Sequence, residues 1–311
     1  MCSSDLLSAV RFNLEKGKIV EFALEGFDGS SPKGPVKLGR FALKSVDLAN
    51  LMRWSALYSN PGQKPSPDQA LGMLALLQGA EVKGLVAPYK DSGKAVNIDN
   101  FDLNWGQFVG PIPSRAHLMA KMTSPLDPTD PDLQPLIAAG MDTGTIDLDL
   151  GANWTEASRT FVLDPATFEL GSLLRASAQV SFGNVPRGVF SLNPMQAAAT
   201  AAQIEAGTMA ITVRDLGCID LAIAQYARSH NASPDDARRA IVDSIRAAGA
   251  SNPDAVPILE AVAHSFENPR GTLTLKLTPR GKVPAMQLIQ TLKTNPLVAL
   301  TQFQVEASTA P

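Results

Sequence analysis

Three segments of the chain open with Gly-Thr and continue with alternating apolar and polar residues, at positions 144–150, 207–213 and 271–277. Their glycines lie 63 and 64 residues apart (207 − 144 and 271 − 207), and an apolar pattern typical of a helix precedes each segment. Counting back another 64 residues reaches Ala80, where a helix pattern again meets a strand pattern. Such a period indicates an internal structural repeat, because one helix-then-strand unit is too small to bury its own apolar face.

The alternation predicts strands that have one dry face and one wet face. Val10, Phe12 and Leu14 alternate with polar residues, and after a Lys-Gly turn the pattern continues over 20–24, which is typical of an antiparallel hairpin. Further strands are expected around 38–43, 82–85, 96–103, 145–150, 161–163, 168–170, 174–180, 208–213, 273–277 and 303–305, with a turn-rich loop over 29–35. Helices are expected around 46–54, 66–79, 133–137, 195–206, 216–226, 233–249, 258–266 and 286–292.

These patterns predict an α+β fold, with a long, twisted, mostly antiparallel sheet and helices packed on one face. We expect helix-then-strand repeats of about 64 residues, in which each helix covers the dry face of the following strand. A β-rich part with short helices is expected over 7–190 and an α+β part with a helical insertion over 191–311; one continuous domain is the alternative. Residues 1–6 read as the translated end of a sequencing adapter, so we expect a non-native scar and a natural chain that begins upstream.

The composition excludes several classes of protein. The 311 residues carry 27 basic and 30 acidic side chains, a net charge of −3, and 45% of them are hydrophobic. A chain that is nearly neutral has no basic excess to mark a nucleic-acid binder, and it is apolar enough to fold. No apolar run approaches the roughly 18 residues that a membrane-spanning helix needs.

Two turns resemble part of a catalytic motif. Asp91-Ser92-Gly93 and Asp142-Thr143-Gly144 match the turns that supply the paired carboxylates of aspartic proteases. Those carboxylates follow strongly apolar strands and come from separate lobes. Here Pro88-Tyr89-Lys90 and Gly140-Met141 precede the two turns, which lie only 51 residues apart (142 − 91). We therefore expect plain turns, and keep a carboxylate-dependent hydrolase as the third functional hypothesis.

No metal site or cofactor is expected. His117, His230 and His264 lack a neighbouring ligand at a spacing typical of metal sites. Asp147 and Asp149 on one strand, and Asp127, Asp130 and Asp132 in a Pro-rich loop, are interpreted as a solvated face and an acidic turn rather than calcium ligands. Arg214, Asp215, Arg238 and Arg239 are expected to form structural salt bridges. Without the residues of the scar, Cys218 is the only thiol, so no internal disulfide is expected.

The order of the elements resembles that of alphaproteobacterial envelope proteins of unknown function, in the style of the YdgA-like and AsmA-like β-rich families. The residues that carry the resemblance are Gly140 with 145–150, Trp154, 161–163, 183–186, 215–217, Leu275, Leu277, Pro279, 283–284 and 295–296. The resemblance covers the last two-thirds of the chain. It implies a protein in the periplasm, or anchored in a membrane and facing the periplasm, with the signal or anchor upstream of these residues. It supplies no catalytic residue.

These observations lead to one main functional expectation. Amphipathic strands without a catalytic constellation predict a non-enzymatic envelope protein that offers an apolar sheet face to a lipid, another amphiphile or an envelope membrane protein. The alternative is a structural or interaction scaffold that binds no ligand. No nucleic-acid partner is expected, and the sequence does not indicate an oligomeric state.

Overall fold

The computed structural model describes all residues except 1–5, 16–17, 59–72, 91, 111 and 250–252. The chain forms two compact units. The first contains Met1–Pro125, Thr143–Asn153 and Phe190–Ala197, and the second contains Leu126–Asp142, Trp154–Val189 and Ala198–Pro311. The strands at 160–183 therefore belong with the second unit, so the sheet-forming part of the first ends near residue 153, earlier than the division expected at 190.

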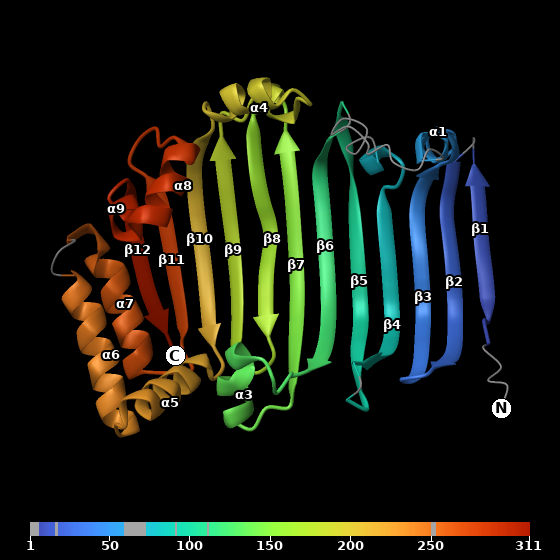
Figure 1. The fold of residues 1–311 in the computed structure, drawn as a ribbon. Helices are drawn as coiled ribbons and strands as arrows, with labels where there is room; N and C mark the ends of the chain where they lie inside the picture. The colour runs from blue at the N-terminus through green and yellow to red at the C-terminus, as the bar shows by residue number, and fades with distance from the viewer. Residues whose placement is uncertain (1–5, 16–17, 59–72, 91, 111, 250–252) are drawn as a thin grey trace. The chain divides into compact units, whose positions relative to one another are not determined.

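The first unit is built on seven antiparallel strands whose order in space is their order in the chain (Figure 1). They are β1 (Ala9–Glu15), β2 (Lys18–Ser31), β3 (Gly34–Asp47), β4 (Gly79–Tyr89), β5 (Lys94–Val109), β6 (Ile112–Pro125) and β7 (Thr143–Thr155). Short hairpin connections join β1 to β2, β2 to β3, β4 to β5 and β5 to β6, as expected for neighbouring antiparallel strands.

Two features of these strands differ from the sequence expectation. The loop expected over 29–35 is only a turn at Pro32 and Lys33, because β2 and β3 continue on either side of it. Strand β6 was not expected, because the run Leu118-Met119-Ala120 is apolar throughout and hides the period of two.

One helix of the first unit follows the expected pattern and another cannot be tested. Helix α1 (Leu48–Tyr58) begins after Asp47, whose side chain accepts a hydrogen bond of 3.0 Å from the backbone N–H of Asn50, as a helix N-cap does. Most of the helix expected over 66–79 lies outside the described residues, which show only a short 3-10 turn, η1 (Met73–Ala75), before β4.

The second unit contains five antiparallel strands, again in chain order. They are β8 (Thr160–Leu170), β9 (Leu174–Gly183), β10 (Glu205–Asp215), β11 (Thr272–Pro279) and β12 (Phe303–Ala310). The helical segments from residue 131 onward are η2 (Pro131–Leu133), α3 (Gln134–Ala138), η3 (Arg187–Phe190), α4 (Pro194–Ala201), α5 (Cys218–His230), α6 (Pro234–Gly249), η4 (Pro253–Ala255), α7 (Val256–Glu267), α8 (Ala285–Thr294) and α9 (Pro296–Leu300).

Helices cover the apolar face of the second sheet. Met209, Leu277 and Val305 lie side by side on β10, β11 and β12, and they pack against a buried cluster that includes Leu288 of α8 and Ala299 of α9. Helix α7 packs against β11 and β12, and a second cluster joins it to α5 and α6. This unit therefore has an ordinary two-layer core of helices on a sheet.

The α+β class with a long antiparallel sheet is confirmed. Helices α3, α4 and α7 precede β7, β10 and β11, as the repeat predicts. The expectation that each helix covers the following strand is wrong for α3 and α4, because neither has a buried residue. Both are short, so they have little apolar surface with which to cover a strand.

Candidate functional site

The first sheet carries two rows of apolar side chains that cross all seven strands. One row contains Val10, Leu24, Phe41, Val82, Phe101, Ala120 and Leu148, and the other contains Phe12, Phe22, Leu43, Ala80, Leu103, Leu118 and Leu150. Each residue is directly opposite the next one in its row, and the two rows are two residues apart on every strand, so they share one face of the sheet. We call these fourteen residues the apolar face; they include no polar side chain.

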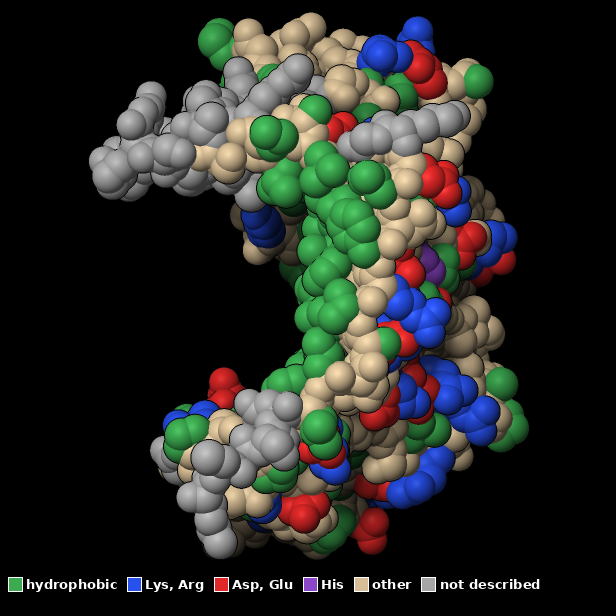
Figure 2. Space-filling view, turned by 90° about the vertical axis from the view of Figure 1, so that its right-hand side faces the viewer, with side chains coloured by type: hydrophobic (Ala, Val, Ile, Leu, Met, Phe, Trp, Pro, Cys, Tyr) green, Lys and Arg blue, Asp and Glu red, His purple; other side chains and the backbone are tan. Residues whose placement is uncertain are grey.

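The apolar face contains no buried residue. Val10, Phe12 and Leu150 at its ends are exposed, with exposed fractions of 58%, 59% and 41%, and the other eleven members are half-buried. Figure 2 shows apolar side chains gathered along one side of the sheet and charged side chains along the other. In the second unit, by contrast, the apolar row of Met209, Leu277 and Val305 packs against a buried cluster that includes residues of α8 and α9.

One row on the charged face of the first sheet contains four buried residues. The row between the two apolar rows includes Ala23, Ala42, Glu81 and Asp102, with exposed fractions of 0%, 0%, 6% and 9%. Successive side chains of a strand point to opposite faces, so this row is on the far side of the sheet from the apolar face. Long charged side chains on neighbouring strands surround it and exclude water from the two alanines.

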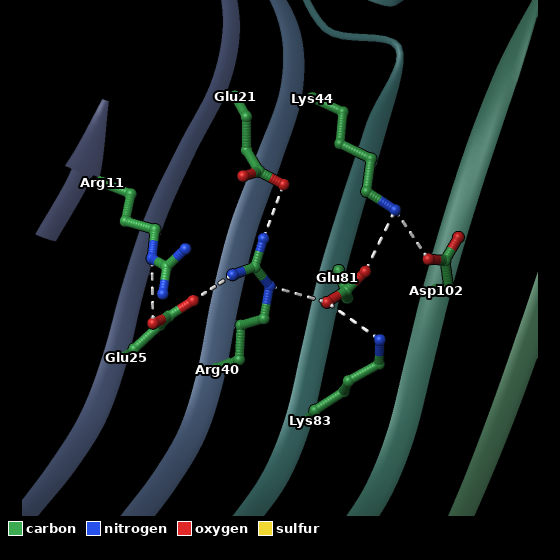
Figure 3. A network of polar contacts seen from close by, with 8 residues as sticks. All are labelled: Arg11, Glu21, Glu25, Arg40, Lys44, Glu81, Lys83 and Asp102. Atoms are coloured by element: carbon green, nitrogen blue, oxygen red, sulfur yellow. Dashed lines mark hydrogen bonds and ion pairs between the residues drawn. The ribbon is translucent and has the colours of Figure 1, made fainter. Parts of the chain in front are cut away.

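Arg40 on β3 is the first centre of the ion-pair network that covers this row (Figure 3). Its guanidinium bonds three carboxylates on both neighbouring strands: Glu21 at 2.6 Å, Glu81 at 3.0 Å and Glu25. Arg11 on the edge strand reaches the other oxygen of Glu25 at 3.1 Å. The planar guanidinium suits this role because it offers several donors in fixed directions.

Glu81 on β4 is the second centre of the network. Its carboxylate accepts from Arg40, from Lys44 at 3.1 Å and from Lys83 at 3.2 Å, and Lys44 also binds Asp102 at 2.8 Å. The eight residues of Figure 3 comprise four cations and four carboxylates, so the network is neutral. A neutral, fully paired network stabilises a sheet face but offers no free charge for a charged ligand.

The protonation states of the network agree with this interpretation. Burial alone would raise the pKa of Glu81, but hydrogen bonds and charges from Lys44 and Lys83 outweigh it and lower that pKa below its ordinary value of 4.5. At Asp102, too, burial alone would raise the pKa. Hydrogen bonds from Lys44 and Asn104 outweigh this effect and lower the pKa below its ordinary value. A general acid needs a raised carboxyl pKa, so neither group has the property that this role requires.

These shifts predict a loss of stability in acid. A carboxylate whose folded-state pKa is lowered stabilises the fold above its unfolded pKa, and this contribution disappears as the pH falls through the folded value. We therefore expect the urea midpoint of the first unit to fall as the pH drops below about 4.5, the ordinary value for Glu81. A series of urea titrations from pH 7 to 3 measures it. The same series on Glu81→Gln should show a shallower fall; an equal slope would contradict the assignment.

Strands β6 and β7 extend the charged face with two separate pairs. Nε2 of His117 lies 2.5 Å from Asp149, and Nζ of Lys121 lies 3.2 Å from Asp147. The sequence marked the two aspartates as a polar strand face, which is confirmed, but it did not reveal their partners on the preceding strand. The register places Lys121 directly opposite Asp147 and His117 diagonally across from Asp149, and this register was not readable from the sequence.

The candidate catalytic and metal-binding residues of the sequence do not form one common site where the structure describes them. No group of three or more His, Cys, Asp or Glu residues there has the arrangement of a metal site. Asp142 is exposed in a loop, and Asp91 lies outside the described residues. Asp130 caps η2 by accepting from the backbone N–H of Asp132, as an acidic turn does. Burial, with the charge of Asp215, raises the pKa of the Cys218 thiol, which makes it a poor nucleophile.

The expected salt bridges around Asp215 take a different form. Asp215 is buried and accepts three hydrogen bonds from backbone N–H groups, those of Gly217, Ile219 and Arg270. Arg239 pairs with Asp236 on its own helix. The prediction that Asp215 pairs with neighbouring arginines is therefore wrong, because its carboxylate is used to cap the start of α5 and to fix the turn before β11.

Comparison with known proteins adds one match. A family model described as "Uncharacterized protein" matches residues 167–310, which covers β9 to β12 and their helices. No curated protein matches the sequence. Among the described residues, no helix combines the length and the apolar character needed to cross a membrane.

Proposed function

We propose that the apolar face of the first unit binds the hydrocarbon chains of a lipid or another amphiphile, in a non-enzymatic bacterial envelope protein that faces the periplasm. One observation carries the proposal: two unbroken rows of apolar side chains cross the first sheet, none of them is buried, and no described helix packs over them as α8 and α9 pack over the second sheet. Soluble proteins seldom expose a continuous apolar surface unless it binds something.

The dimensions of the apolar face suit an extended hydrocarbon chain. Neighbouring strands are about 4.8 Å apart, so seven strands span roughly 29 Å. The hydrocarbon core of a bilayer is about 30 Å thick, so one acyl chain of a single leaflet is about half as long as a row. Each methylene group that leaves water for such a surface gains up to about 0.8 kcal/mol. The rows therefore offer enough length and enough apolar contact for at least one acyl chain.

The chemistry of the rest of the first unit supports binding rather than catalysis. The carboxylates of the charged network are paired and have lowered pKa values where a shift is resolved, and they lie on the face opposite the apolar rows. The resemblance to envelope families supports the location that we propose.

Two adjacent residues of β6 provide a matched test. Leu118 lies on the apolar face and Met119 on the charged face, and both are half-buried. We expect Leu118→Gln to weaken binding of a fluorescent long-chain fatty acid by about tenfold, the loss of roughly one side chain's apolar contact. Met119→Gln should change the dissociation constant less than twofold. Fluorescence titration of the full chain measures both.

The outcomes of this test are distinct. Equal urea midpoints for the two variants would show that the difference arises in binding and not in folding. If neither the wild-type chain nor the variants bind the fatty acid, and native mass spectrometry of protein from a bacterial membrane fraction shows no retained lipid, the proposal is wrong. The scaffold alternative would then be favoured.

A further inference from the structure

Strand β1 forms an open edge of the first sheet. In the described part of the chain, the one neighbour of β1 in the sheet is β2. Figure 2 views the sheet from the edge that β1 forms. Val10, Phe12 and Leu14 are exposed, with fractions of 58%, 59% and 51%. An edge strand presents unpaired backbone N–H and C=O groups along its length, which is the template for pairing with another strand.

Among the described residues, this edge lacks most of the features by which proteins usually prevent such pairing. Natural edges are blunted by proline, by charged side chains such as lysine, by a bulge, or by a covering helix, and of these β1 has only the charges of Arg11 and Glu15, one of each sign. The sequence of β1 is Ala-Val-Arg-Phe-Asn-Leu-Glu, which contains no proline, glycine or lysine. The register shift beside Asn13 places its extra residue, Val20, on β2 and not on β1. The outermost strand of the second unit, β12, has α7 packed against it. The exposed apolar residues of β1 further favour its association with a second strand, because pairing would remove their side chains from water.

We propose that β1 pairs in antiparallel fashion with β1 of a second copy of this chain, around a two-fold axis that passes between the two Asn13 residues. In this register Asn13 lies opposite Asn13 of the second copy, Phe12 lies opposite Leu14, and Arg11 lies opposite Glu15. The two-fold axis makes each of the last two pairs occur twice, as in any isologous interface. This inference is independent of the proposed function.

The charges of β1 select this register. With Asn13 at the centre, two Arg11–Glu15 pairs form across the junction, and opposite charges directly across two strands stabilise their pairing. A register centred on Arg11 would place the two arginines opposite each other, which is unfavourable. A register centred on Phe12 would place Arg11 opposite Asn13, so the Arg11–Glu15 pair would be lost. Arg11 bonds Glu25 through Nε, and its guanidinium has further N–H donors for a second carboxylate.

The same register also keeps both faces of the sheet consistent. Pairing residues whose numbers sum to 26 places Phe12 against Leu14 on one face, and Arg11 and Asn13 against polar residues on the other. The apolar face of one copy would thus continue onto the next copy without a polar interruption. A register shifted by one residue on one strand would set apolar side chains against polar ones.

Cysteine cross-linking tests the register. In a chain with Cys2→Ser and Cys218→Ser, we expect Asn13→Cys to form a disulfide-linked dimer on mild oxidation, because opposite Cα atoms lie about 4.5–5.5 Å apart. Arg11→Cys alone should not cross-link, since its own copy would lie four residues along the strand, about 13 Å away. A mixture of Arg11→Cys and Glu15→Cys chains should cross-link, because those two positions face each other.

A charge reversal gives a second readout on the chain without cysteine substitutions. Glu15→Arg would place two arginines opposite each other, and we expect the dissociation constant of the dimer, measured by sedimentation, to rise at least tenfold. Glu306→Arg, on an exposed residue of β12, should leave it unchanged. A chain that remains monomeric at its highest soluble concentration would overturn the proposal. So would cross-linking of Arg11→Cys alone as efficient as that of Asn13→Cys.

Discussion

Replacing Glu81 with glutamine is expected to lower the free energy of unfolding of the first unit by about 3 kcal/mol, the low end of the range for removing one partner of a buried ion pair. Glu81 is 6% exposed and accepts from three cations, so its loss leaves Arg40, Lys44 and Lys83 without their shared carboxylate. The low end applies because the side chains of Arg40 and Lys44 remain 24% and 34% exposed and regain some hydration.

Glu306→Gln is the matched control for this substitution. Glu306 also lies on a strand and pairs with the lysine directly opposite, Lys276, at 3.2 Å, but its side chain is 55% exposed. Exposed pairs of this kind contribute about 0–1 kcal/mol. Urea titration of both variants, with hydrogen exchange to separate the two units, measures the difference. Equal losses for the two substitutions would mean that burial of the Glu81 network does not matter to stability.

The sequence predicted the positions of the strands in the first unit better than it predicted their cross-strand partners or the helices that cover them. The period of two identified the hairpin of β1 and β2 and the wet face that carries Glu21 and Glu25, because each is encoded in consecutive residues. It failed at β6, where Met119 occupies the charged face and removes the alternation. Strand type is thus a local property, and a single apolar residue on the polar face is enough to hide it.

The candidate site depended on information that the sequence does not carry. The partners Lys44 and Asp102 are 58 residues apart, and only the register of β3, β4 and β5 brings them within 2.8 Å. The sequence predicted dry faces covered by helices, and this holds for Leu277 and Val305 but not for the described residues of the first sheet. Whether a dry face is covered depends on helix placement in space, which local patterns do not determine.

Removing the side chain of Asp215 is expected to destabilise the second unit by about 3 kcal/mol. Oδ1 accepts from the N–H groups of Gly217 and Ile219, both at 3.1 Å, and Oδ2 accepts from that of Arg270 at 2.7 Å. Asp215→Ala leaves three donors without an acceptor, and each costs about 1–3 kcal/mol when buried. The low end applies because Arg270 is exposed and its N–H regains water. The loss also removes a carboxylate from the start of α5, where the helix dipole favours one.

Asp220→Ala separates this role from simple ion pairing. Asp220 lies in the first turn of α5 and bonds the side chain of Arg270 at 3.2 Å, with 44% of its own side chain exposed. We expect a loss below about 1 kcal/mol, as for exposed pairs in general. Urea unfolding followed through the buried Trp154 measures both variants. Faster amide exchange at Ile219 and Arg270 in Asp215→Ala alone would locate the effect at the capped groups. Similar losses in the two variants would contradict the assignment of the effect to the capped backbone groups, because Asp220 bonds none of them.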